Sequence, residues 1–255
     1  FKMIELKYVK LLLFLSLYKS CNCVEIGKYL QICDRNSPDV NDCLVDAIQE
    51  GLIKLSDGIP EFDVPPIDPY VQKEIRVEYK NNQVIVKMIM KNIVVTGLKT
   101  AKVHDVRLKA DEDRFYMEVD ITSPKVFVSG QYYGEGRYTS LNIKTDGEFN
   151  TTMTDLVYTW KLEGKPEVVN ETSYIKIDSF YMRPDVGGFR SYISNVVPDN
   201  PELTQVANEF ANRNWRILYR EMLPYAQANW NKIGIRVANK IFLKVPYDEL
   251  FPTKN

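Results

Sequence analysis

The chain has 255 residues, of which 45% are hydrophobic and 12% are aromatic. This length suits one domain with a sizeable core, and the composition excludes an intrinsically disordered chain. The formal net charge of −1 at pH 7 provides no general basic surface for a nucleic acid or an anionic membrane, so we expect neither as the main partner.

The first residues follow the order of a secretory signal peptide: a basic flank, an apolar run at residues 11–17, and small residues that place cleavage after Cys23. We therefore expect a signal peptide at residues 1–23 and a mature, extracellular domain at residues 24–255. An N-terminal core helix is the alternative, which the order of charged and apolar residues disfavours. The run is shorter than the ~20 residues of a membrane span, and no other stretch is long and apolar enough to form one.

Two cysteines remain beyond this leader. Cys33 and Cys43 flank a turn-rich loop, and in an oxidising compartment we expect them to form a disulfide. Glycosylation sequons begin at Asn150 and Asn170, in agreement with secretion. The sequence contains no Cys-x-x-Cys, and His104 is its only histidine, so we expect no metal site and no cofactor.

After the cysteine pair, apolar residues at helical spacing predict a helix that ends at about Leu55. Either Asn41 or Asp42 can cap its first turn. The proline-rich segment 59–69 ends this helix, because proline interrupts regular hydrogen bonding, and we expect it to cross the surface in an extended path.

From about Ile75 to Met182, apolar and polar residues alternate with the two-residue period of strands that have one face in water. The clearest example is segment 115–121. Strands joined by short turns predict an antiparallel meander. Turn signals occur at residues 80–82, 111–113, 134–136, 146–147 and 164–166.

The last third predicts a long amphipathic helix that starts at Asn200-Pro201 and runs to about residue 243. Pro224 lies inside it, where the missing backbone N–H predicts a kink. At ~1.5 Å per residue such a helix would reach about 60 Å, and only the meander can cover it, so the sheet must curl along the helix. The expected fold class is therefore α+β.

Sequence motifs of known enzyme classes are missing from the chain. It has no G-x-S-x-G, H-E-x-x-H, Walker or dinucleotide-binding motif. A nucleophile activated by histidine would have to use His104, and an ester hydrolase of that kind has little support. We therefore expect that the protein is not an enzyme.

Seven segments of the chain are distinctive: Cys33 to Leu44, Gly58 to Phe62, Ile67 to Pro69, Gly130 to Tyr132, Phe210 to Trp215, Asn239 to Phe242 and, most specifically, Val245 to Pro252. Together they resemble the insect Takeout / juvenile-hormone-binding protein family, and the resemblance covers residues 24–255. It implies a strongly curved antiparallel sheet around a long C-terminal helix, related to tubular lipid-binding domains, and a disulfide between Cys33 and Cys43. It also implies a secreted carrier of hydrophobic small molecules, found in haemolymph or another extracellular fluid.

We expect the ligand, such as a juvenile hormone-like terpenoid or a fatty acid, to lie in an apolar tunnel between sheet and helix. Tyr132 is the expected polar contact, although its hydroxyl can equally bond to backbone. The alternative function is a secreted protein-interaction module with a filled core, and the sequence identifies no receptor. The expected tunnel walls are Met88, Phe115, Met117 and Val128 from the sheet, and Phe210, Trp230, Ile233 and Val237 from the helix.

Overall fold

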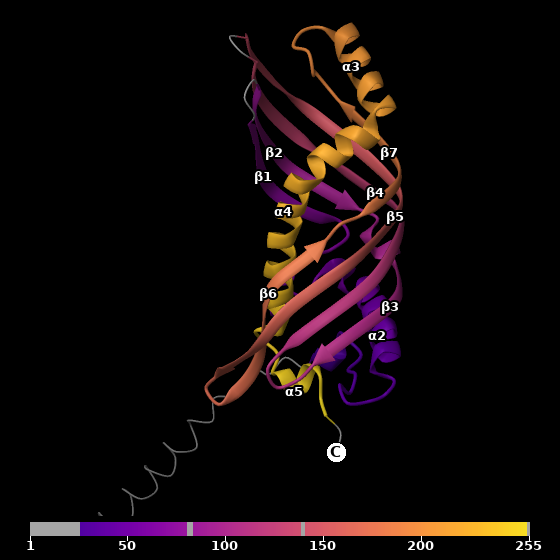
Figure 1. Cartoon of the computed structure of the whole chain (residues 1–255), viewed down its shortest axis with the longest axis vertical. Helices are drawn as coiled ribbons and strands as arrows, with labels where there is room; N and C mark the ends of the chain where they lie inside the picture. Colours follow the sequence, from indigo (N-terminus) through magenta and orange to yellow (C-terminus); the bar gives the residue numbers. More distant parts are fainter. Residues whose placement is uncertain (1–25, 81–83, 139–140, 254–255) are drawn as a thin grey trace, which may run out of the picture.

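The computed structural model describes residues 26–80, 84–138 and 141–253, so the predicted signal peptide lies outside the described residues (Figure 1). None of the helices in the described part of the chain is both long and apolar enough to cross a bilayer. The helices of four or more residues are α2 (Val40–Lys54), α3 (Pro201–Arg213), α4 (Trp215–Phe242) and α5 (Tyr247–Leu250). The strands are β1 (Tyr70–Lys80), β2 (Val84–Thr96), β3 (Lys102–Ala110), β4 (Phe115–Tyr138), β5 (Leu141–Val169), β6 (Thr172–Met182) and β7 (Asp185–Ile193).

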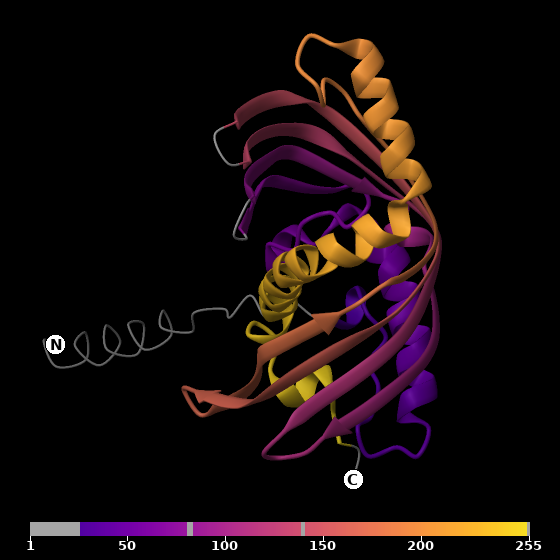
Figure 2. The same cartoon turned by 45° about the horizontal axis from the view of Figure 1, so that its top comes forward.

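The seven described strands form one antiparallel sheet that curls around α4 (Figure 2). The central strands β4 and β5 have 24 and 29 residues and run through the whole length of the molecule. In the upper half, which contains α3 in Figure 1, they are flanked by β1, β2 and β7. In the lower half, beside α2 and α5, they are flanked by β3 and β6. The predicted fold class, a curved antiparallel sheet with a long C-terminal helix, is confirmed.

Three of the predicted turns are wrong, because residues 134–136, 146–147 and 164–166 lie inside β4 and β5. Two of the glycines there, Gly147 and Gly164, allow close packing. A Cβ on Gly147 would lie 2.4 Å from the Ser194 hydroxyl oxygen, and one on Gly164 would lie 2.3 Å from the backbone oxygen of Lys176. Glycine inside a strand marks such approaches as often as it marks a turn.

The sheet also extends further than the predicted limits of Ile75 and Met182. It begins at Tyr70 and includes β7, which the alternation did not indicate. Two consecutive glycines weaken the apolar pattern of β7, and each sits where a side chain would collide with β5. A Cβ on Gly188 would lie 2.6 Å from the Thr154 hydroxyl oxygen.

The predicted helices form, with different ends and breaks. Residue Asp39 precedes α2 as its N-cap, and Asn41 instead accepts a hydrogen bond from the backbone N–H of Leu108 in β3, at 3.1 Å. The C-terminal helix begins where predicted, with the Asn200 side chain capping its first turn. It breaks at Asn214, between α3 and α4, whereas Pro224 lies inside α4 without ending it.

Side-chain amides of the helices bond to the outer edges of the sheet. In three of these contacts, an asparagine side chain accepts a hydrogen bond from the N–H of a strand residue and donates one to the C=O of that strand residue, as a neighbouring strand would do. The helices therefore cover edges that would otherwise expose unpaired backbone groups. The pairs are Asn208 with Ile193 and Asn212 with Ser191 on β7, and Asn239 with Ile177 on β6; Gln49 of α2 bonds Ala101 and Val103 beside β3 in a similar way.

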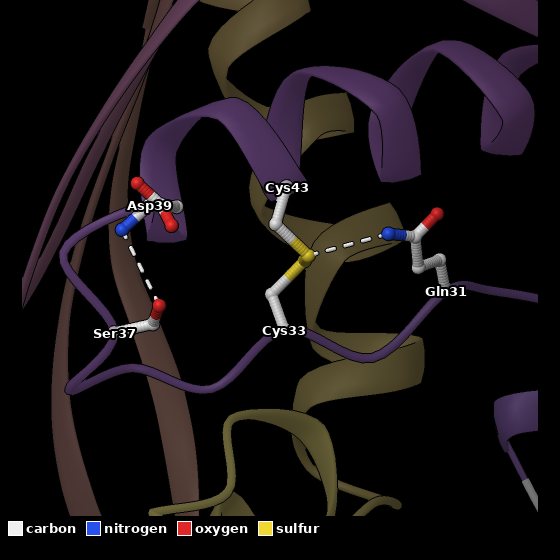
Figure 3. The surroundings of a disulfide bond; sticks show 5 residues. All are labelled: Gln31, Cys33, Ser37, Asp39 and Cys43. Carbon is white, nitrogen blue, oxygen red and sulfur yellow. Dashed lines mark hydrogen bonds between the residues drawn. A yellow bond between two sulfur atoms is a disulfide. The ribbon is translucent and has the colours of Figure 1, made fainter.

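The predicted disulfide between Cys33 and Cys43 is present, with Cα atoms 5.9 Å apart (Figure 3). The loop that it closes holds the C-terminal segment. The Arg35 guanidinium lies 4.3 Å from the ring centroid of Tyr247, forms an ion pair with Asp248 at 2.9 Å, and donates to the backbone oxygen of Phe251. The disulfide loop therefore joins the two ends of the described chain.

Candidate functional site

The inner face of the lower half is a closed apolar core. Phe115 is fully buried, and its ring lies 5.3 Å from that of Phe242 in α4 and 5.4 Å from that of Phe251 after α5. Val119 and Ile121 continue this buried row along β4. Aromatic rings from sheet, helix and C-terminal segment thus fill the lower interior.

The inner face of the upper half is apolar but only partly covered. Strand register places its residues on one side of the sheet, since Val77 faces Met88 and Met90 faces Tyr132. This side meets α4, because the Tyr79 ring lies 6.1 Å from that of Tyr225. We call the following partly exposed residues the upper inner face: Ile75, Val77, Val86, Met88, Met90, Val128 and Phe149.

The start of the C-terminal helix also leaves apolar side chains in contact with solvent. Phe210 is 63% exposed, and helical spacing places it opposite Asn208 and Asn212, which bond to β7. Neighbouring exposed residues form a stripe with it: Leu203, Val206, Ile217, Leu218 and Met222. Single exposed apolar residues are common on protein surfaces, but a continuous exposed apolar stripe is not. A stripe of this length therefore indicates a site for a partner or a ligand.

The predicted wall residues therefore fall into four places. Met88 and Val128 belong to the upper inner face, and Phe115 and Met117 belong to the lower core. On the helix, Phe210 is in the exposed stripe. The predicted residues Trp230, Ile233 and Val237 are partly exposed on α4. The α4 residues that pack against the buried core are instead Trp215, Tyr219, Ile235, Ala238, Ile241 and Phe242.

Tyr132, the predicted polar contact, is 7% exposed and its hydroxyl already has partners. It donates to the backbone oxygen of Ser194 at 2.7 Å and lies 3.1 Å from the Thr145 hydroxyl. Of the two roles considered for Tyr132, the structure displays the bond to backbone. This bond attaches the loop after β7 to the inner face of β4.

Three polar side chains on the inner face, midway along β4 and β5, were not predicted as site residues. The hydroxyls of Ser123 and Tyr158 lie 2.9 Å apart, and the indole nitrogen of Trp160 lies 3.3 Å from the sulfur of Met182. Alternation along β5 predicted that Tyr158 and Trp160 share a face. Ser123 carried no sequence signal, because its partner is 35 residues away.

A cleft of about 1120 Å³ lies elsewhere, between α3 and β7. Its lining includes Asn208, Asn212 and Thr204, whose polar atoms already bond to nearby backbone. None of the predicted ligand contacts lines it. The cleft is therefore a surface feature separate from the apolar upper inner face.

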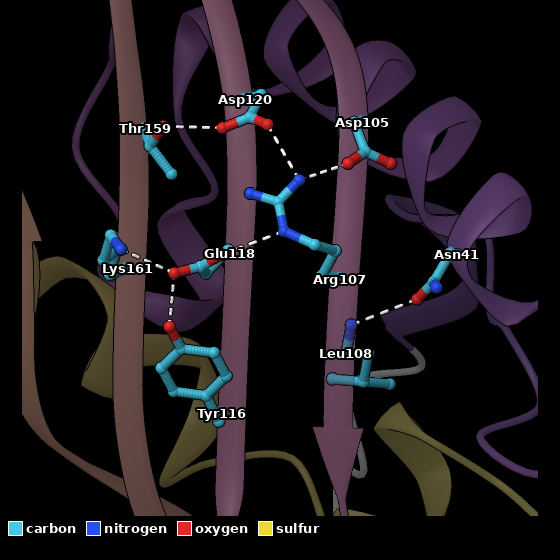
Figure 4. Close-up of polar contacts among 9 residues, drawn as sticks. All are labelled: Asn41, Asp105, Arg107, Leu108, Tyr116, Glu118, Asp120, Thr159 and Lys161. Carbon is cyan, nitrogen blue, oxygen red and sulfur yellow. Dashed lines mark hydrogen bonds and ion pairs between the residues drawn. The ribbon is translucent and has the colours of Figure 1, made fainter.

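The outer face of β3, β4 and β5 carries a network of charged side chains (Figure 4). Arg107 bonds to Glu118, Asp120 and Asp105, and these contacts raise its pKa. The bonds that Glu118 accepts from Lys161 and Tyr116 lower its pKa to about 2. Because these charges compensate one another on the outside of the sheet, the network stabilises strand pairing and holds no group in an unusual reactive state.

Other candidate groups are exposed. His104 lies on the surface with its Nε2 atom 2.7 Å from the Thr122 hydroxyl. Both sequon asparagines, Asn150 and Asn170, are exposed as well. Within the described ranges, no group of three or more acidic, cysteine or histidine side chains is placed to hold a metal ion.

Comparisons with known proteins agree with this architecture. The model of the family described as haemolymph juvenile hormone binding protein matches residues 11–252. The chain is 22% identical over 216 residues to the circadian clock-controlled protein daywake of Drosophila yakuba, covering 82% of this chain and 83% of that protein. It is 20% identical over 224 residues to a putative beta-carotene-binding protein of Schistocerca gregaria, covering 88% of each. Its fold is similar to that of Takeout 1 of Epiphyas postvittana, with a TM-score of 0.69, 21% identity, and coverage of 87% of this chain and 99% of that one.

Proposed function

Because the chain belongs to the haemolymph juvenile hormone binding protein family, we propose that it is a secreted carrier that reversibly binds one small hydrophobic molecule and catalyses no reaction. The ligand is a terpenoid, a fatty acid or another lipid. The observation that supports this proposal is the upper inner face, where apolar residues line the curl of the sheet and are only partly covered. In a closed core these residues would be buried, and on an ordinary solvent-exposed face of a sheet they would be polar.

In this proposal, Met88 and Val128 form the sheet side of the site, and Phe210, Trp230, Ile233 and Val237 form the helix side. Phe115 and Met117 belong to the packed core below the site, and Tyr132 borders the site near β7. A ligand that buries about 300 Å² of apolar surface gains roughly 7 kcal/mol at about 25 cal/mol per Å², before the cost of association. The apolar driving force also predicts that affinity depends little on salt.

A pair of matched variants tests the location of the site. Val128 lies on the upper inner face, whereas Val157 is 57% exposed on the outer face of the same sheet. Val128→Asn should weaken binding of the fluorescent probe N-phenyl-1-naphthylamine by about tenfold, because it places an amide against the ligand. Val157→Asn should leave the dissociation constant unchanged. Equal effects of the two variants would place the site elsewhere.

The cargo itself can be identified by extraction of the purified protein with organic solvent and mass spectrometry. A stoichiometric lipid or terpenoid supports the carrier. A protein that holds no lipid and takes up no probe is instead an interaction module with a filled core.

Secretion is tested by expression in insect cells, where the protein should appear in the medium. It should also lose mass on treatment with an N-glycosidase that removes glycans from Asn150 and Asn170.

A further inference from the structure

In the described part of the chain, the interior contains a hydroxyl hydrogen that has no hydrogen-bond acceptor. Ser123 and Tyr158 are 1% and 7% exposed, and their oxygens share one hydrogen bond of 2.9 Å. Two hydroxyls carry two hydrogens, and either oxygen can be the donor of the shared bond. Whichever one donates, the other hydrogen has no acceptor among the described residues. Burial raises the pKa of Tyr158, so its phenol stays protonated at neutral pH.

A second donor next to this pair is only weakly satisfied. The indole N–H of Trp160 is directed at the thioether sulfur of Met182, 3.3 Å away on the opposite strand. A thioether is a weak acceptor, and methionine is a flexible side chain that can move aside. The Trp160 ring lies 6.3 Å from that of Tyr158, and Trp160 is only partly buried. The two underused donors are therefore neighbours on one face of β5.

The Ser123–Tyr158 pair lies between the closed and the open part of the interior, and Trp160 lies on the closed side of this pair, opposite Val119 of β4. Towards the lower half, β4 continues with the fully buried Ile121 and Val119. Towards the upper half, it continues with Val126 and then with Val128 of the upper inner face. A ligand that extends along the upper inner face would thus bring one end to Ser123, Tyr158 and Trp160.

We propose that Ser123, Tyr158 and Trp160 form a polar subsite that donates hydrogen bonds to an acceptor oxygen at one end of the hydrophobic ligand. The acceptor is a carbonyl, ester or ether oxygen. This inference rests on the proposed carrier function and narrows its ligand class from any apolar molecule to one with such an oxygen. A pure hydrocarbon would leave the spare hydroxyl hydrogen without an acceptor and the Trp160 N–H with only the thioether sulfur, and buried donors without good acceptors cost free energy.

A ligand series tests the subsite through displacement of N-phenyl-1-naphthylamine. Methyl palmitate should bind the wild-type protein about threefold to tenfold more tightly than the straight-chain alkane of equal length, the range expected of one or two net hydrogen bonds. In Ser123→Ala/Tyr158→Phe the ester should lose most of this advantage, while the alkane should bind as well as before. Alkane binding also serves as the control for correct folding, and Trp160→Phe carries the same expectation if the double variant does not fold.

An infrared measurement on the wild-type protein is independent of any variant. The carbonyl band of bound methyl palmitate, labelled with carbon-13 at the carbonyl, should shift to lower wavenumber than in hexane. A band at the hexane position, or equal affinity for ester and alkane, would overturn the subsite while leaving the carrier intact. Failure of both molecules to displace the probe would instead overturn the proposed function.

Discussion

At the scale of single residues, the charged network on the outer face makes stability depend on pH. The pKa of Glu118 is about 2 in the folded protein, below its ordinary 4.5, first because of its bond with Lys161 and then because of its bond with Tyr116. A lowered folded-state pKa contributes stability that is present above about pH 4.5 and is lost as the pH falls towards 2. We expect Glu118→Gln to lower the free energy of unfolding at pH 7 by about 1 kcal/mol after solvent screening.

The difference between wild type and Glu118→Gln should shrink towards zero at pH 2.5, where the wild-type carboxylate is becoming protonated. Urea unfolding at the two pH values measures it. Glu112→Gln is the matched control, because Glu112 is exposed in the turn between β3 and β4. A difference between wild type and Glu118→Gln that is the same at both pH values would show that the carboxylate stabilises the fold through packing and not through its charge.

Tyr132 allows a second prediction at this scale. Its hydroxyl donates to the backbone oxygen of Ser194, so Tyr132→Phe removes one buried hydrogen bond. We expect the free energy of unfolding to fall by about 1 kcal/mol, and the amide of Ser194, which bonds to Glu148, to exchange faster with deuterium. Affinity for an apolar probe should change little. A large loss of affinity together with unchanged stability would instead make this hydroxyl a ligand contact.

At the scale of elements, the helices replace strands at the edges of the sheet. Asn208 and Asn212 each accept from and donate to a residue of β7, at distances of 2.7–2.8 Å. In Asn208→Ala/Asn212→Ala the edge of β7 would be exposed, so the amides of Ser191 and Ile193 should exchange faster and the protein should aggregate more readily. Gln205→Ala, an exposed change on the same helix, is the control. Unchanged exchange at both amides would show that α3 covers the edge without these bonds.

The elements also show which parts of the fold were predictable. Alternation along segment 115–121 was sufficient to predict a strand, and Asn200-Pro201 was sufficient to predict the start of the C-terminal helix. Each of these signals depends only on local periodicity or capping. The position of the helix break was not predictable, since Pro224 is the stronger local signal and yet α4 continues through it. Gly147 appeared to be a turn residue because its actual reason, close contact with Ser194, joins positions that are distant in sequence.

At the scale of the whole molecule, the site was harder to predict than the fold. Met88 and Val128 were predicted for one wall, and the strand register places them on one face of the sheet with Tyr132, but alternation does not say where along that face the interior is filled. That depends on the closing aromatic rings: Phe115 meets Phe242 and Phe251, which come from the other end of the chain. The Ser123–Tyr158 pair was missed for the same reason, because serine is common on strands and only the partner gives it meaning.

The disulfide loop is the device that holds the whole molecule closed at its lower end. It places Arg35 against Tyr247, Asp248 and the backbone of Phe251, and Phe251 packs on the core.

The loop between Cys33 and Cys43 spans a sequence separation of 10, so Cys33→Ser/Cys43→Ser should reduce stability by about 2–3 kcal/mol in the chain-entropy model. Because Arg35 then loses its fixed position, we expect deuterium exchange to rise at residues 247–251 as well as in the loop. Arg35→Ala, with the disulfide intact, should reproduce the faster exchange at the C-terminal segment with a smaller loss of stability. If exchange rises only within the loop, the C-terminal segment is held by the packing of Phe251 alone and the two ends are not coupled.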